Sequence, residues 1–313
     1  MRPHGMHHVT AVSADIRANK RFYTEVLGMR LVKRSVNQDD VSAYHLFYAD
    51  GAGSPGSDLT FFDWKVPPER RGGHAFVRTA LRIEGQEALA FWEARLREHG
   101  VAVEAPAERD GRWTLDFEDP EGQRLALVDD GGDGDVPVPW DAAPVPAERQ
   151  IRGLGPVRAR IPDAARTEPL LQHVFGMRLD RSYELDGREV RVHVMGDGGA
   201  HAEVHLEIDP DAPPARPGAG GVHHVALRVR DDAYDDWAER LRRSGVPNSG
   251  PVDRFWFRSL YVRDANGLLF ELASDGPGFA VDEDPERLGT TVVLPPFLEP
   301  QRERIVAGLT PLD

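Results

Sequence analysis

The sequence predicts an α+β fold built from four similar units, which form two pseudo-repeated halves. Two pairs of similar segments support this prediction. Residues 92–101 resemble residues 237–246, which lie 145 positions later (237 − 92). Residues 26–31 resemble residues 174–179, which lie 148 positions later (174 − 26). Internal similarity at such spacings indicates a fold assembled from repeated supersecondary units.

Each unit is predicted to contain a strand, a helix and then further strands. Unit one begins with an alternating apolar strand at 7–12, and its helix at about 16–26 is ended by Gly28. Units two to four show the same order. The chain is therefore divided into an N-terminal half of two units at 1–130, a linker rich in Gly, Pro and Asp at 131–150, a C-terminal half of two units at 151–273, and a tail at 274–313 that is expected to dock on the body.

The composition excludes several classes of protein. With 313 residues and 40% hydrophobic content, the chain can bury two cores, and no apolar run approaches membrane-spanning length. A net charge of −14 disfavours nucleic acid and anionic membranes as partners. The absence of cysteine removes disulfides and thiolate chemistry. We expect a cytoplasmic location, because the start of the chain lacks a secretory signal, and a homo-oligomer is left open.

Candidate metal ligands stand out in unit four. A histidine pair, His223 and His224, begins an apolar alternating strand, and Glu271 lies alone inside the apolar run at 268–273. A buried carboxylate without a partner is costly, whereas a divalent metal shared with a neighbouring histidine would stabilise it. Two ligands are too few, so a third is expected elsewhere in the chain.

Unit one is the place where the third ligand is expected. Only units one and four begin with two histidines, His7 and His8 in unit one. The repeat puts Ala126 where unit four has Glu271, Pro156 where unit one has His8, and either Arg78 or Thr79 where unit four has His224. The repeated unit therefore does not require these side chains for folding. Two histidines and one carboxylate form the facial triad typical of non-haem Fe(II), provided that units one and four are neighbours.

Strand alternation should send the members of each pair to opposite faces, so that only one histidine of each pair binds the metal. The pattern does not decide which one. The other histidines, among them His45 and His205, lack this spacing and are interpreted as surface or core residues. No glycine-rich phosphate loop leads into a helix, and no Gly-x-Ser-x-Gly elbow is present.

The chain resembles the vicinal oxygen chelate superfamily, whose fold consists of βαβββ units, and more narrowly its bacterial ring-cleaving dioxygenases that open hydroquinones and catechols. The segments that carry the resemblance are Leu-Val-Lys-Arg-Ser-Val-Asn at 31–37, Tyr-His-Leu-Phe-Tyr-Ala-Asp at 44–50, Gly-Ser-Pro-Gly at 53–56, Phe-Arg-Ser-Leu-Tyr at 257–261, Leu-Phe-Glu-Leu at 269–272 and Gly-Pro-Gly-Phe at 276–279.

This resemblance implies the ligand set and the roles of the residues around it. The second histidine of each pair, His8 and His224, would bind the metal with Glu271. His7 and His223 would then support or pack against the ligands. Tyr261 matches a tyrosine that faces the metal-bound substrate in hydroquinone-cleaving relatives. Arg254 falls at a basic position, although the loop before Phe257 differs in composition.

The implied activity is an extradiol-type, Fe(II)-dependent dioxygenase, with Mn(II) as the alternative metal, acting on a small aromatic diol and O₂. Two other functions remain as alternatives. One is a glyoxalase-type metal-dependent lyase or isomerase, which usually has two histidines and two glutamates. The other is a metal-free small-molecule-binding protein of the bleomycin-resistance kind, which generally lacks the triad.

Overall fold

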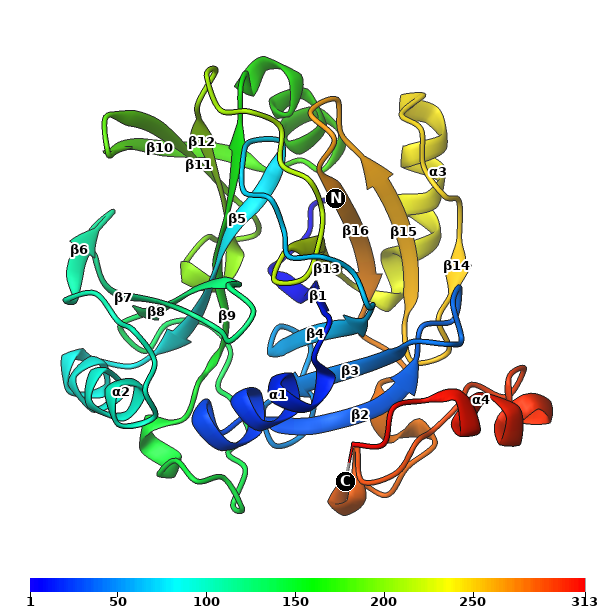
Figure 1. Cartoon of the computed structure of the whole chain (residues 1–313). Helices are drawn as coiled ribbons and strands as arrows, with labels where there is room; N and C mark the ends of the chain where they lie inside the picture. Colours follow the sequence, from blue (N-terminus) through cyan, green and yellow to red (C-terminus); the bar gives the residue numbers. More distant parts are fainter. Residues whose placement is uncertain (313) are drawn as a thin grey trace.

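Two curled eight-stranded sheets form the body of the protein, in a computed structural model that describes residues 1–312 (Figure 1). The first sheet consists of β1 (Met6–Ser13), β2 (Arg30–Val36), β3 (Tyr44–Ala49), β4 (Asp58–Asp63), β13 (Val222–Val229), β14 (Val252–Asp253), β15 (Arg258–Arg263) and β16 (Leu269–Ser274). The second sheet consists of β5 (Ala75–Ile83), β6 (Ala107–Arg109), β7 (Arg112–Glu118), β8 (Arg124–Asp129), β9 (Gly153–Ile161), β10 (Arg178–Leu185), β11 (Arg188–Val194) and β12 (Glu203–Ile208).

Each sheet takes one unit from each half of the sequence. The first has the strand order β14-β15-β16-β13-β1-β4-β3-β2, so units one and four meet where β1 pairs antiparallel with β13. The second has the order β10-β11-β12-β9-β5-β8-β7-β6, so units two and three meet where β5 pairs with β9. The α+β fold of four units is confirmed, and the condition for a site shared by units one and four is met. The boundaries of the two halves of the chain, at residues 130 and 151, remain a prediction from the sequence repeat.

Few helices accompany the sheets. They are α1 (Ile16–Arg21) continued by a π-helical turn at Phe22–Val26, α2 (Gln86–Glu98), α3 (Tyr234–Ser244) and α4 (Arg302–Gly308), while unit three has only short turns at Ala164–Arg166 and Leu170–Val174. The repeated tryptophans, Trp92 of α2 and Trp237 of α3, are buried against the sheets. Within residues 1–312, no helix is long and apolar enough to cross a membrane.

Alternation along the strands separates a shared core from two inner faces. Phe270 of β16 belongs to the large core and packs edge-to-face against Phe76 of β5 and Phe175. Its neighbour Glu271 points to the other face of the first sheet. We call that face, which carries the apolar cluster of Phe47, Ala226, Trp256, Phe257 and Phe279, the first cup. The equivalent face of the second sheet, with the cluster of Ala80, Ala126 and Val128, is the second cup.

The C-terminal tail lies against the first sheet (Figure 1), and a buried ion cluster is one of its contacts there. Lys33 of β2 is fully buried, and its ammonium donates to the carbonyl of Phe279 and to Asp282, both at 2.9 Å, and to Glu283. The same ammonium lies 5.0 Å from the centre of the Trp256 ring. A buried charge of this kind is stable only while its partners remain in place.

We expect Lys33→Met to destabilise the protein by about 3 kcal/mol, because it leaves two carboxylates without their buried cation. The matched control is Lys65→Met, since Lys65 pairs with Asp63 at 2.7 Å but is 58% exposed. That change should cost less than about 1 kcal/mol. Urea unfolding of both variants measures the difference, and equal midpoints would contradict the role given to Lys33.

Candidate metal centre

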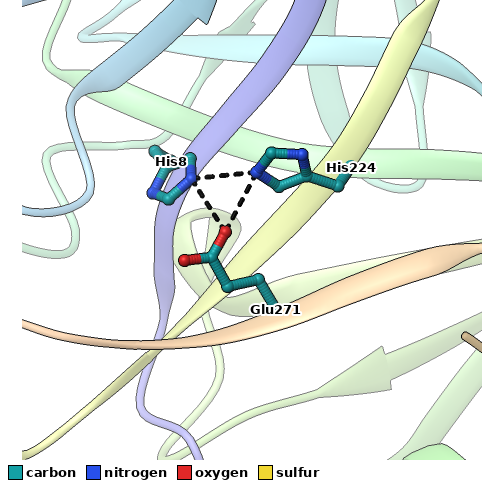
Figure 2. Close-up of side chains that lie close together, drawn as sticks. All are labelled: His8, His224 and Glu271. Carbon is teal, nitrogen blue, oxygen red and sulfur yellow. Dashed lines mark hydrogen bonds and ion pairs between the residues drawn. The ribbon is translucent and has the colours of Figure 1, made fainter. Parts of the chain in front are cut away.

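His8, His224 and Glu271 converge in the first cup, from β1, β13 and β16 (Figure 2). The two Nε2 atoms lie 3.2 Å apart. Glu271 Oε2 lies 3.2 Å from His8 Nε2 and 3.0 Å from His224 Nε2. All three side chains are buried, and Glu271 is 0% exposed. The pairing of β1 with β13 and of β13 with β16 therefore gathers residues from opposite ends of the chain.

The chemistry of these three groups fits a bound cation. Burial alone would raise the pKa of Glu271, but the adjacent His8 and His224 hold that pKa well below its usual range, so the carboxylate is ionised. Oε1 accepts a hydrogen bond from Ser259, whereas Oε2 is buried without a hydrogen-bond donor among the described residues. Three electron-pair donors thus face one point, and a divalent metal would satisfy them together.

The first histidine of the unit-one pair orients the second. Burial, together with neighbouring His8, lowers the pKa of His7 to about 3, so its ring is neutral. His7 Nε2 lies 3.1 Å from the carbonyl of Ser274 and must carry the proton, which makes Nδ1 an acceptor. That atom lies 2.9 Å from His8 Nδ1, so His8 donates from Nδ1 and presents the lone pair of Nε2 to the metal position.

The unit-four pair repeats this contact. His223 Nδ1 lies 2.8 Å from His224 Nδ1, and burial with the adjacent His224 lowers the pKa of His223 to about 3. Both contacts depend on β-bulges, because the β1–β13 register skips His7 and His223. The prediction that strand alternation separates the members of each pair is therefore wrong. A bulge re-aims the extra residue and brings its ring beside that of the ligand.

A small aromatic cavity of about 40 Å³ opens beside the triad. Its walls include the triad histidines together with Asn37, Gln38, Asp39, His45, Phe47, Phe62, Arg254, Trp256, Phe257 and Tyr261. A larger cavity of about 880 Å³, lined by α1 and β7, contains none of the triad residues. The aromatic walls are suited to a planar ring held over the metal position.

Tyr261 and Arg254 both reach this cavity. The Tyr261 ring meets the His224 ring edge-on at 5.7 Å, and Arg254 Nε donates to the phenol oxygen at 3.2 Å. Arg254 is held by Asp39 at 2.8 Å, and its carbonyl accepts from Gln38 at 2.9 Å. Burial and the Glu271 charge raise the pKa of Tyr261, so its hydroxyl keeps its proton at neutral pH. The phenol hydrogen is then available to an oxygen in the cavity.

Sequence reasoning missed His45, which was interpreted as a surface or core residue. His45 lies on the cavity wall, and its Nε2 bonds Thr60 at 2.9 Å, while Thr60 bonds Thr10 at 2.8 Å. Burial lowers the pKa of His45 well below its usual value. The signal that could have found it is the alternation of His45 with Phe47, which puts both on one face of β3.

The strand register shows whether Arg78 or Thr79 is equivalent to His224, a choice that the sequence repeat left open. Ala226 pairs with Glu271 in the first sheet, as Ala80 pairs with Ala126 in the second. Counting two residues back from each alanine, Arg78 occupies the place of His224, and Thr79 does not. Pro156 correspondingly occupies the place of His8, because Arg158 pairs with Arg78 as Thr10 pairs with His224.

A second group of candidate ligands, Asp110, Glu203 and His205, lies on the second sheet. Glu203 already accepts two hydrogen bonds from Arg112, at 2.7 and 2.8 Å, and two from Arg181, at 3.1 Å. His205 Nε2 also lies 2.9 Å from Glu203. A carboxylate filled by guanidinium groups has no lone pair left for a metal, so this group is an ion-pair network.

The family model described as Glyoxalase/Bleomycin resistance protein/Dioxygenase superfamily matches residues 5–127 and 153–272. The chain belongs to this superfamily. All three triad residues lie inside the two matched stretches.

Relatives match the chain from end to end. MhqA of Bacillus subtilis strain 168, named as a ring-cleaving dioxygenase, is 43% identical over 100% of both chains. A Sphingobium indicum protein named chlorohydroquinone/hydroquinone 1,2-dioxygenase is 29% identical, over 97% of this chain and 95% of its own. The crystal structure of a Bacillus subtilis protein described as a dioxygenase superposes with a TM-score of 0.91 at 32% identity, covering 100% of this chain and 98% of the other.

We expect His8→Ala, His224→Ala and Glu271→Ala each to abolish stoichiometric binding of a divalent metal, because two ligands remain. His7→Ala should weaken metal affinity about 10–100-fold, since it removes the group that orients His8. His205→Ala is the control and should keep full metal content. Elemental analysis and metal titration of the purified variants measure these effects. Metal retained by Glu271→Ala at full stoichiometry would show that the triad is not the ligand set.

Proposed function

We propose that the protein is a metal-dependent dioxygenase that cleaves the ring of a small aromatic diol of the hydroquinone or catechol type. His8, His224 and Glu271 are the proposed ligands, with Fe(II) as the metal and Mn(II) as the alternative. The observation that carries the proposal is the convergence of two imidazole nitrogens and one unfilled carboxylate oxygen beside an aromatic cavity. The names of the end-to-end relatives support the same reaction class.

Bound Fe(II) would supply adjacent positions for the diol and O₂ and a route for electrons between them. The chain's own residues bind and orient the ring. Phe47, Phe62 and Phe257 line the cavity, so they exclude water and stack against a planar substrate. His8 and His224, which would hold the metal with Glu271, line this cavity, so the substrate would approach the metal from it.

Tyr261 is the proposed proton donor to the substrate oxygen. Its hydroxyl keeps its proton at neutral pH, and Arg254 occupies one lone pair of the phenol oxygen, which directs the hydrogen elsewhere. Arg254 is itself fixed by Asp39, so the donor is preorganised. We propose that Arg254 and Tyr261 together stabilise negative charge that develops on the oxygen atoms of the reacting ring.

A glyoxalase-type reaction is less well supported by the residues present. Among residues 1–312, the candidate ligand group in the first cup contains one carboxylate, Glu271, rather than two. The second sheet has Ala126 at the equivalent position, so it contributes no further carboxylate there. A metal-free binding protein would not need three buried ligand atoms aimed at one point.

An oxygen electrode distinguishes these functions. With anaerobically Fe(II)- or Mn(II)-loaded protein, we expect one O₂ to be consumed per hydroquinone or catechol, with loss of the aromatic absorbance and a ring-opened acid in the mass spectrum. The triad variants should consume none. Metal-loaded protein that leaves both diols intact but isomerises a hemithioacetal would replace this proposal with the glyoxalase-type function.

Tyr261→Phe should keep the fold and the metal but lower kcat about 10²-fold, because the variant loses the proton donor and retains the ring. The control is Tyr48→Phe, since Tyr48 is also buried but donates to Asn19 at 3.0 Å, outside the triad cavity. Steady-state kinetics with hydroquinone provide the measurement. If Tyr261→Phe has the kcat and KM of the parent enzyme, the phenol has only a packing role.

A further inference from the structure

The second cup repeats the architecture of the first but not its metal chemistry. Ala126 and Pro156 stand in the places of Glu271 and His8, so two of the three ligand positions carry small side chains without lone pairs for a metal. The bulges are kept, because the β5–β9 register also skips Val77 and shifts next to Pro156. The truncated side chains leave a cavity of about 60 Å³ on this face.

One wall of this cavity is apolar. Ala80, Ala126, Val128 and Pro156 line it, and the first three form a buried cluster of their own. In the first cup the corresponding face is covered by the loop residues Trp256 and Phe257 and by Phe279 of the tail. The cluster of the second cup contains no residue of the loop or tail. A flat apolar body can therefore lie where the first cup has its ligands.

Arginines line the same cavity beside these apolar residues. Arg78 and Arg158 are directly opposite one another in the β5–β9 pairing, and like charges at such positions destabilise a sheet. Asp116 is shared by Arg78 at 3.1 Å and Arg109 at 2.5 Å. Glu207 is likewise shared by Arg158 at 3.2 Å and Arg160 at 2.8 Å.

These four arginines share two carboxylates, and Asp110, which also lines the cavity, is paired with Arg181, so positive charge is in excess here in an otherwise acidic protein. Arg78 Nε is buried and has no hydrogen-bond acceptor among the described residues. Burial, opposed by Asp116 and reinforced by Arg158, lowers the pKa of Arg78 to about 10. A cation held in such surroundings is stabilised by an anion placed beside it.

We propose that the second cup binds a small aromatic or unsaturated carboxylate. The carboxylate accepts hydrogen bonds from the guanidinium groups of Arg78, Arg109 and Arg158, and the planar body lies on Ala80, Ala126 and Pro156. Guanidinium groups match the geometry of a carboxylate and bind it with two parallel hydrogen bonds. The apolar wall selects against small hydrophilic anions, which gain nothing from contact with it.

Benzoate is the probe, titrated calorimetrically into the full-length, metal-free protein, with benzyl alcohol as the uncharged analogue. We expect one benzoate site per chain, weakened by added salt, and no heat from benzyl alcohol. Arg78→Met and Arg109→Met should each weaken benzoate binding about tenfold or more, because each removes a charged hydrogen-bond donor. Arg109 lies on the edge strand β6 and is partly exposed, so its variant keeps the test informative if Arg78→Met fails to fold.

Two matched controls locate the site. Arg97→Met removes an exposed arginine of α2 that pairs with Glu93, and it should bind benzoate as the parent protein does. His8→Ala disables the first cup and should also leave benzoate binding unchanged. Absence of benzoate binding, an affinity of Arg78→Met and Arg109→Met equal to that of the parent protein, or loss of binding in His8→Ala would each overturn the proposal.

Discussion

The antiparallel pairing of β1 with β13 is the interaction on which the candidate site depends. It places Ala226 opposite His8 and His224 opposite Thr10. The parallel pairing of β13 with β16 then puts Glu271 beside Ala226. The side chains of His8 and His224 are 216 positions apart in the sequence, yet their Nε2 atoms lie 3.2 Å apart. A shift of one residue in either register would turn a ligand to the opposite face of the sheet.

The β-bulges beside this pairing help to set which ring nitrogen of a ligand histidine carries the proton. An extra residue in a strand is re-aimed, and here it is a histidine that contacts the ligand histidine. His7 takes its tautomer from the Ser274 carbonyl and transmits it to His8. The second sheet keeps the bulges without histidines, with Val77 at one of them. The bulges therefore belong to the fold, while the histidines at them belong to the site.

The two cups are built from the same arrangement of strands but have different electrostatic environments. The first cup gathers two imidazole rings and an ionised carboxylate, which together attract a cation. The second replaces them with alanine, proline and arginine, and it gathers guanidinium groups against an apolar wall. The same strand positions therefore point to a metal on one side of the molecule and to an organic anion on the other.

The sequence by itself determined the repeat and the α+β class, and it singled out Glu271 and the two histidine pairs, of which the family resemblance implied His8 and His224 as ligands. These features rest on local periodicity and on the contrast between equivalent positions, such as Glu271 against Ala126. Tertiary structure decided which units share a sheet, because a repeat does not encode the partner of its edge strand. It also decided that His7 lies beside His8, that His45 lines the cavity, and that Arg78 occupies the place of His224. Each of these depends on register and bulges, which arise only when strands from distant parts of the chain pair.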